Sequence, residues 1–235
     1  MKYSEVTLTI TTSKRFNLFK KSIMSFYDRC KDWDLIKNII IVDDASSKTD
    51  IENMKQLLSG IKKDILFICK DNPDHVQSLN ILFDKVKTDY VFHLEDDWNF
   101  IQHGNFIREG FEIMADNDKI KTVIMRNWIK QGNKDFHRCK TKTGLEYHIH
   151  HYNFKKHIPG ELNTYPGYSL NPSLQNMKHI KDIIGKFTRT INFELQFALR
   201  YCNIGTGFLT AMMANDYCEH IGTNINAYAL NNTKP

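Results

Sequence analysis

The sequence predicts an α/β fold in which a mostly parallel central sheet is flanked by helices, with a smaller antiparallel sheet in the second half. Over the first hundred residues, short apolar runs of strand type alternate with segments of helical periodicity. Two of these runs end in clusters of acids, which is where parallel sheets bind their ligands. No linker-like composition or internal repeat interrupts the chain of 235 residues. We therefore expect a single domain with two halves, residues 1–100 and 101–235.

The first half is predicted to run βαβαβαβ. Its strands are rich in β-branched, aromatic or continuous apolar residues and are expected at 6–12, 39–42, 65–69 and 90–94. Its helices repeat apolar residues at helical spacing and are expected at 14–30, 51–61 and 76–86. Ser13 and Asp74 are placed to cap the first and third of these helices.

The second half has weaker patterns. Its helices are expected at 106–117, 173–187 and 193–202, the last with Asn192 as its cap. Its strands are expected at 122–125, 136–141, 145–152, 208–213 and 217–221, with a hairpin turn at 142–144. The hairpin carries many basic residues and places His148 and His150 on one face. Because no carboxylate or cysteine accompanies them at ligand spacing, a solvated basic hairpin is favoured over a metal site.

The charge is unevenly distributed. Residues 1–120 carry 17 basic and 20 acidic residues, whereas residues 121–235 carry 15 and 7, with seven of the ten histidines. This asymmetry indicates an acidic site in one half and a face for an anionic partner in the other. Five scattered cysteines without metal-site spacing indicate reduced thiols, and no signal peptide or bilayer-spanning apolar run is visible, so we expect a cytoplasmic protein.

The chain is organised around Glu95-Asp96-Asp97, which directly follows the apolar strand 90–94. Three adjacent carboxylates repel one another, so their charge needs compensation, and a divalent cation carrying a phosphorylated ligand is the simplest candidate. A solvated acidic turn is the alternative. Asp43 and Asp44 end the second strand, and the topology predicts both clusters at one edge of the sheet. The chain has neither a GxGxxG fingerprint nor a P-loop.

Together these motifs resemble a known family. The first strand ends in Thr11-Thr12-x-x-Arg15, followed by Val-Asp-Asp-Ala-Ser-Ser at 42–47 and Leu-Glu-Asp-Asp-Trp at 94–98. The combination resembles nucleotide-sugar-dependent glycosyltransferases of the Rossmann-like GT-A fold, similar to family 2, with Glu-Asp-Asp as a variant of the Asp-x-Asp motif. The resemblance implies that residues 1–100 bind the nucleotide sugar and that 101–235 bind the acceptor. It covers residues 6–100 well and the rest more loosely.

The resemblance implies a bound Mn²⁺ or Mg²⁺, which neutralises the nucleoside diphosphate as it leaves. Asp97 would bind the metal directly, with His220 as a further ligand. Glu95 or Asp96 would meet the ribose or a metal-bound water, and Glu95 is a candidate metal ligand as well. Glu95 stands where the family more commonly has Asp, so the side chain at this position of the acidic cluster is longer. A satisfied core histidine is the alternative interpretation of His220.

For the nucleotide, the resemblance implies that Asp43 and Asp44 meet the base and the ribose, flanked by Thr11, Thr12 and Arg15. A carboxylate there can accept the imide N–H of uracil, so a UDP-sugar is the favoured donor. Asp44 is also placed to cap the following helix, and both roles can hold at once.

Glu194 is placed like the family's general base, which deprotonates the acceptor hydroxyl for displacement with inversion. Alternatively, it is a first-turn acid favoured by the helix dipole. Asp216 or Glu219 is the next candidate for the base.

The acceptor is expected to contact the second half. Its aromatic side chains could stack on sugar rings, and the candidates are Tyr147, Tyr152, Tyr165 and Tyr168. A glycan or glycolipid acceptor is favoured, and hydroxymethylated bases in DNA are the minority hypothesis. A nucleotidyltransferase is a rival reading, but residues 12–16 lack the glycine-rich loop such enzymes carry. A non-catalytic binding module is the other rival.

Overall fold

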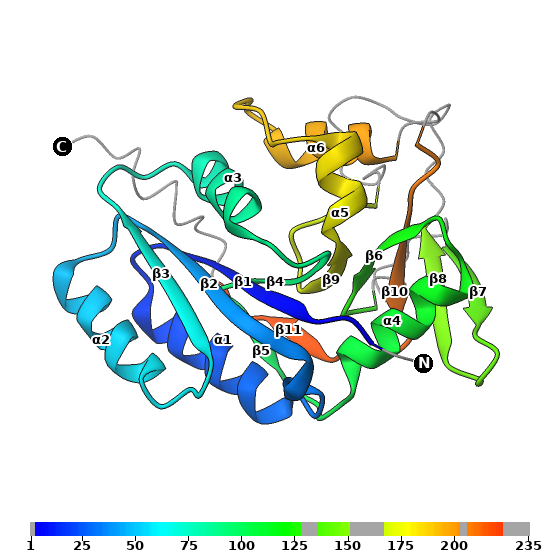
Figure 1. The fold of residues 1–235 in the computed structure, drawn as a ribbon, viewed down its shortest axis with the longest axis horizontal. Helices are drawn as coiled ribbons and strands as arrows, with labels where there is room; N and C mark the ends of the chain where they lie inside the picture. Colours follow the sequence, from blue (N-terminus) through cyan, green and yellow to red (C-terminus); the bar gives the residue numbers. More distant parts are fainter. Residues whose placement is uncertain (1–2, 128–135, 151–166, 203–205, 223–235) are drawn as a thin grey trace.

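The computed structural model of the protein describes residues 3–127, 136–150, 167–202 and 206–222. Its first half alternates strands and helices as predicted (Figure 1). The elements are β1 (Val6–Thr12), α1 (Phe16–Arg29), a short 3-10 helix (Trp33–Leu35), β2 (Ile36–Asp44), α2 (Lys48–Leu58), β3 (Asp64–Lys70), α3 (His75–Lys85) and β4 (Tyr90–Glu95).

The second half adds shorter strands. Its elements are β5 (Trp98–Phe100), α4 (Phe106–Asp116), β6 (Ile120–Ile124), β7 (Phe136–Lys140), β8 (Glu146–His150), β9 (Ser173–Asn176), α5 (Met177–His179), a π-helical turn η5 (Ile180–Ile184), α6 (Phe193–Tyr201), β10 (Leu209–Met213) and β11 (Cys218–His220). Among the described residues, no helix has both the length and the apolar character that a membrane span requires.

One large mixed sheet runs through the molecule in the order β3-β2-β1-β4-β9-β6-β10-β8-β7. The core strands β3, β2, β1 and β4 are parallel to one another, whereas β9 runs antiparallel to both of its neighbours. The hairpin of β7 and β8 extends this sheet through β10. The α/β fold with parallel core strands is therefore confirmed.

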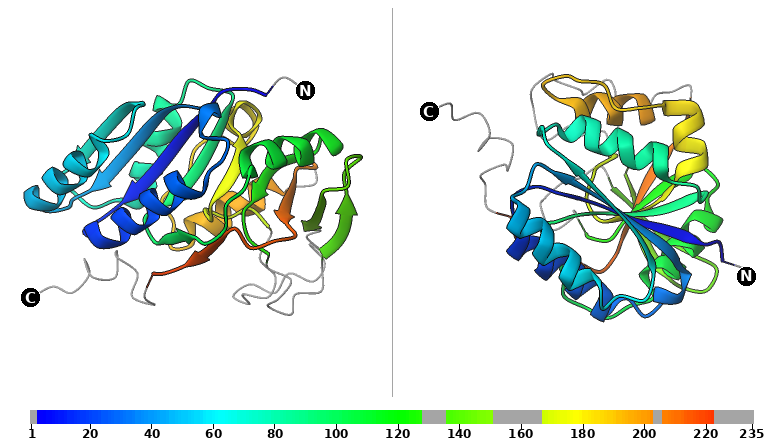
Figure 2. Two further views of the ribbon diagram at one scale, coloured as in Figure 1. Left: turned by 90° about the horizontal axis from the view of Figure 1, so that it is seen from below. Right: turned by 60° about the vertical axis from the view of Figure 1, so that its left-hand side comes forward.

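Helices cover both faces of the sheet: α1, α2 and α4 lie on one face, and α3, α5 and α6 lie on the other (Figures 1 and 2). Strand β2 shows why both faces must be covered. Ile39 and Ile41 belong to the core that contains α1, while Ile40 and Val42 belong to the core that contains α3 and α6. Successive side chains of a strand point to opposite faces, so a continuous apolar run contributes to two cores.

The predicted smaller antiparallel sheet is also present. It pairs β5 with β11, and His220 lies opposite Trp98 in this pair. Because β5 begins immediately after the acidic cluster, the pairing brings a late segment of the chain beside Asp97.

The helix predicted at 173–187 is wrong at its start. Ser173–Asn176 forms β9 between β4 and β6, and the helical segment begins only at Met177. Backbone pairing on both sides of this segment outweighs its helical apolar spacing, because a strand placed inside a sheet satisfies all its backbone donors and acceptors.

The prediction of a solvated basic hairpin is wrong for β8, whose residues Tyr147 to His150 are buried. Tyr147 and Tyr168 are also buried, with 2% and 0% of their surface exposed, so neither can stack on an acceptor sugar. Tyr152 and Tyr165 lie outside the described residues.

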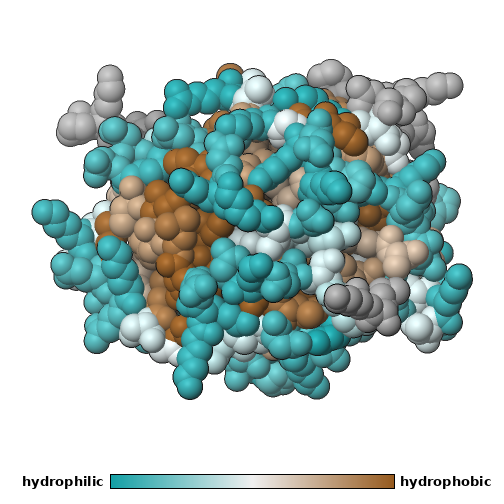
Figure 3. Space-filling view, viewed as in Figure 1, coloured by the Kyte–Doolittle hydropathy of each residue, from teal (hydrophilic) through white to brown (hydrophobic). Residues whose placement is uncertain are grey.

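Hydrophilic side chains cover much of the surface in Figure 3, and an apolar area lies at the edge strand β3, where Leu66 is 43% exposed.

Candidate active site

The acidic clusters meet at one edge of the sheet, as predicted. In the strand register Thr12 pairs with Asp43 of β2, and Thr11 pairs with both Val42 and Glu95 of β4. The carboxyl ends of three adjacent parallel strands therefore carry Thr11 and Thr12 between the two groups of acids. This is the edge at which open α/β sheets bind their ligands.

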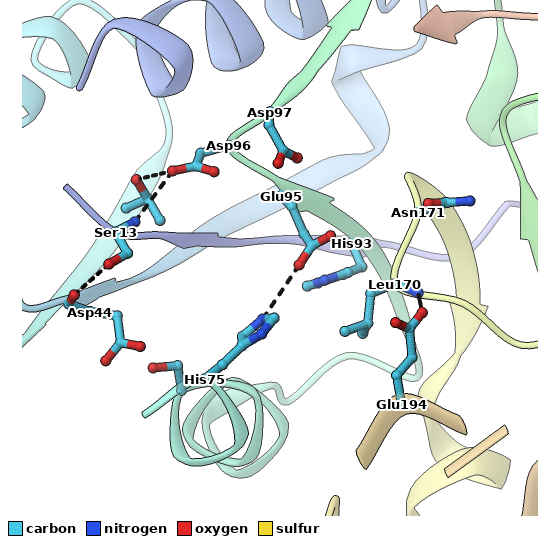
Figure 4. Close-up of polar contacts among 12 residues, drawn as sticks. Ser13, Asp44, His75, His93, Glu95, Asp96, Asp97, Leu170, Asn171 and Glu194 are labelled. Atoms are coloured by element: carbon cyan, nitrogen blue, oxygen red, sulfur yellow. Dashed lines mark hydrogen bonds and ion pairs between the residues drawn. The ribbon is translucent and has the colours of Figure 1, made fainter. Parts of the chain in front are cut away.

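Ser13 links the two clusters (Figure 4). Its hydroxyl donates to the backbone oxygen of Asp44 over 2.7 Å, and its backbone N–H donates to Asp96 Oδ2 over 3.3 Å. Ser13 therefore does not cap α1 as predicted, since the cap position is Arg15, which makes no side-chain capping bond. The serine instead bridges the end of β2 and the turn after β4 through these two hydrogen bonds.

Asp96 anchors the turn after β4. It is fully buried, accepts a 2.8 Å hydrogen bond from Thr12 Oγ1, and pairs with the guanidinium of Arg15. Burial raises the pKa of its carboxyl to about 7, against the opposing effect of Arg15. Asp96 has no exposed surface, and its contacts are with Thr12, Ser13 and Arg15, so its predicted contact with the ribose or a metal-bound water stays a prediction.

Arg15 also contacts the next acid, since its Nη1 lies 3.1 Å from Asp97 Oδ2. Burial opposes the charge of the guanidinium, but Asp96 and Asp97 outweigh it and raise the pKa of Arg15. A permanently charged group with several N–H donors thus lies beside Asp97 at the acidic edge, where it can bind phosphate.

Asp97 and His220 form the candidate metal site. His220 Nε2 lies 3.3 Å from Asp97 Oδ2, and Asp97 Oδ1 is buried without a hydrogen-bond partner among the described residues. A Cβ added to Gly222 would lie 2.7 Å from Asp97 Oδ2, so the backbone passes close to both side chains. An oxygen and an imidazole nitrogen suit a divalent cation. No group of three ligating side chains is found in the described ranges, so these two residues would supply part of the ligand set.

Trp98 packs beside this site. The His220 ring lies 5.1 Å from the Trp98 ring, and the Arg126 guanidinium lies 5.2 Å from it. Arg126 lies two residues after the end of β6 and was missed in the sequence, where no motif marks it. The ring therefore brings a second cation to the acidic edge.

Asp43 and Asp44 are both fully buried. Asp43 Oδ2 accepts a 3.0 Å hydrogen bond from Ser46 N, its Oδ1 has no partner in the described structure, and burial raises the pKa of this carboxyl.

Asp44 forms a 2.7 Å ion pair with Lys70 Nζ. Its two carboxylate oxygens also accept hydrogen bonds of 2.9 and 3.0 Å from the backbone N–H of Asp74. Asp44 does not cap α2, because Ser47 does so by accepting from Asp50 N. The nucleotide-binding role of the pair stays a prediction.

Asp74 connects this pair to α3. Its side chain caps the helix by accepting a 3.0 Å hydrogen bond from Gln77 N, as predicted, while its backbone N–H donates a hydrogen bond to Asp44.

Replacing Asp74 by alanine is expected to lower the free energy of unfolding by about 1 kcal/mol, because the cap is lost while the backbone N–H remains. Urea denaturation measures this, with Asp71→Ala, an exposed acid in the same loop, as the matched control. Equal values for the two variants would contradict the capping role.

Glu95 extends away from Asp97 toward the first turn of α3 (Figure 4). Its Oε1 lies 3.4 Å from His75 Nε2, and the side chains are 24% and 16% exposed. The His75 ring packs edge-on against Phe193, with centroids 5.3 Å apart. Sequence reasoning missed His75. Its place one residue after the cap of α3 is the signal that could have located it, because that helix begins at the carboxyl edge of the sheet.

Glu194 lies in the first turn of α6, one residue after Phe193. Its Oε1 accepts a 2.9 Å hydrogen bond from Leu170 N, and Figure 4 places its carboxylate across from Glu95. The alternative bases are engaged elsewhere: Asp216 Oδ1 accepts from Asn127 N, and Glu219 Oε1 accepts from Asn99 Nδ2. Figure 4 shows the Glu194 carboxylate beside Leu170, and its role as the general base stays a prediction.

Comparison with known structures finds a protein of similar fold. A solved mannosyltransferase, PcManGT from Pyrobaculum calidifontis in complex with GDP-Man and Mn²⁺, has a similar structure with a TM-score of 0.68. The chain has the fold of this glycosyltransferase. The likeness covers 97% of this chain and 60% of the mannosyltransferase, at 12% sequence identity. The chain thus spans about three fifths of that protein. No protein-family model matches the sequence, and no curated protein matches it.

Proposed function

We propose that the protein is a metal-dependent glycosyltransferase of the GT-A type, which moves a sugar from a nucleotide-sugar donor to an acceptor hydroxyl. The observation that carries this proposal is the grouping of Asp97, His220 and Arg15 at the carboxyl edge of the sheet. The similar fold of a mannosyltransferase that binds GDP-Man and Mn²⁺ supports it.

Each residue has a distinct part in the proposed reaction. Mn²⁺ or Mg²⁺, held by Asp97 and His220, would supply Lewis-acid stabilisation of the departing diphosphate. Arg15 binds the same phosphates by charge-assisted hydrogen bonds. Glu194 takes the proton from the acceptor hydroxyl as the hydroxyl oxygen attacks the anomeric carbon, and the bond to the diphosphate breaks, so the sugar is transferred with inversion.

The donor's base is proposed to lie near Asp43 and Asp44, beside Thr11 and Thr12. A carboxylate can accept a hydrogen bond from the imide N–H of uracil, which favours a UDP-sugar as the donor. A guanine base also presents an N–H donor edge, and the mannosyltransferase of similar fold binds GDP-Man. Donor panels should therefore include both nucleotides.

For the acceptor, we propose a glycan or glycolipid bound by residues 101–235. The excess of basic residues after residue 120 keeps hydroxymethylated DNA as a second candidate, and it would give strongly salt-dependent binding. A nucleotidyltransferase reaction is disfavoured by the absence of glycine between β1 and α1.

The proposal predicts slow donor hydrolysis by the wild-type protein in the absence of acceptor. Incubation with Mn²⁺ and a panel of UDP- and GDP-sugars should release nucleoside diphosphate from one class of donor, and EDTA should abolish the release because the diphosphate then leaves without a cation. Release of nucleoside diphosphate is measured by a coupled assay. Equal release before and after EDTA, or none with any donor and any candidate acceptor, would rule out the proposed activity.

A further inference from the structure

We propose that His75 and Glu95 together bind the transferred sugar of the donor, and that His75 is a specificity-determining residue of the site. This rests on the proposed function. The ligand class is a sugar with two adjacent free hydroxyls. The starting observation is the 3.4 Å separation between His75 Nε2 and Glu95 Oε1 at the edge where β4 ends.

The position of the pair follows from the direction of two neighbouring side chains. Asp97 contacts His220 at the proposed diphosphate site, whereas Glu95 points toward His75 on α3 (Figure 4). Glu194 approaches from α6 on the far side of Glu95. A sugar that extends from a diphosphate at Asp97 toward an acceptor at Glu194 would lie beside Glu95, whose carboxylate contacts His75.

The length of Glu95 has a reason in this geometry. An aspartate is shorter by one carbon–carbon bond, about 1.5 Å, and its carboxylate would not reach His75 from the same backbone position. The glutamate therefore couples the acidic edge to α3 in a way that the commoner aspartate could not.

The His75 ring packs on Phe193, and the preceding residue, Asp74, is anchored by several contacts. Asp74, its neighbour in sequence, is fixed by its backbone N–H to Asp44 and by its side chain to Gln77 N. Arg189 pairs with the Asp74 carboxylate. Phe193 packs on the His75 ring and is itself packed against Phe187 at 5.9 Å. A side chain fixed in this way is suited to recognition, since little freedom remains to be lost on binding.

The chemistry of the pair suits a diol. The imidazole offers an N–H donor and the carboxylate offers acceptor oxygens, while each sugar hydroxyl both donates and accepts. Both side chains keep accessible surface, 16% for His75 and 24% for Glu95, so a ligand can reach them while they contact one another. A site built to hydrogen-bond hydroxyls discriminates strongly against a ligand that lacks them.

The test compares binding of a nucleotide sugar with binding of the matching nucleoside diphosphate, using GDP-mannose with GDP and UDP-glucose with UDP, all with Mn²⁺, by isothermal titration calorimetry. His75→Ala should weaken binding of the preferred nucleotide sugar about tenfold, the loss of one to two hydrogen bonds, while the affinity for the diphosphate alone stays within about twofold. His75→Gln, which keeps an N–H donor, should recover most of the loss.

Glu95→Asp should cause a similar loss, and the double variant with His75→Ala should lose little more, because both changes break one pair. His103→Ala is the control, since His103 pairs with Arg29 near the far end of α1. Equal weakening of the sugar nucleotide and the diphosphate, or no weakening of either by His75→Ala, would overturn the inference. Wild-type protein that binds no nucleotide sugar would overturn the proposed function, and the inference with it.

Discussion

Asp97→Asn is expected to lower metal-dependent sugar transfer by about a thousandfold, an effect typical of removing one preorganised electrostatic contact to the transition state. The amide keeps the size of the side chain but removes the negative charge that lies 3.3 Å from His220 Nε2. A neutral amide binds a hard divalent cation far more weakly than a carboxylate does. The departing diphosphate then loses its main source of charge neutralisation.

The measurement is the rate of nucleoside diphosphate release across a titration of Mn²⁺. The variant should need much more metal and reach a much lower maximum. Asp34→Asn is the matched control, because Asp34 is 65% exposed and pairs with Arg108 away from the acidic edge. A rate for Asp97→Asn within tenfold of wild type at low metal would exclude Asp97 as a ligand.

Glu194→Gln is expected to lower transfer to the acceptor by about 10² to 10⁴-fold, the usual contribution of a general base. The glutamine can still accept the hydrogen bond from Leu170 N, so the first turn of α6 should keep its position. It cannot take a proton from the acceptor hydroxyl. Binding of the nucleotide sugar should remain close to that of wild type, because Glu194 makes no part of the proposed diphosphate site.

Two assays separate these effects: titration calorimetry with the donor, and transfer kinetics with a glycan acceptor. Gln196→Ala, an exposed change on the same helix, serves as the control. Full transfer activity in Glu194→Gln would reject the base assignment and would turn attention to Asp216 and Glu219. It would leave the assignment of the donor site unaffected.

The first hundred residues were predictable because each element carries a strong local pattern. Ile39 to Val42 is a continuous apolar run, and the acids follow the strands directly, so topology alone places them at one edge. The segment Ser173–Asn176 was not predictable from its own residues. It becomes β9 because two strands distant in sequence, β4 and β6, leave a place between them.

The site was predictable as a set of acids but not as a network. Asp44 forms an ion pair with Lys70 and accepts a hydrogen bond from Asp74 N. Ser13 forms hydrogen bonds to both Asp44 and Asp96. These contacts join residues far apart in the sequence and could not be predicted from local patterns. His75 was missed for the same reason, since a histidine in the first turn of a helix carries no signal until the neighbouring strand end is known. Tyr147 and Tyr168 were misjudged because an aromatic residue on a polar segment can still be buried.

The pairing of β5 with β11 links cation binding to the docking of β11, because the two proposed ligands lie on different segments of the chain. His220 reaches Asp97 only while β11 is seated on β5. A cation held by both residues would favour the seated strand over the detached one in proportion to its affinity. Occupancy by the cation would then be measurable as protection of the β11 amides from hydrogen exchange.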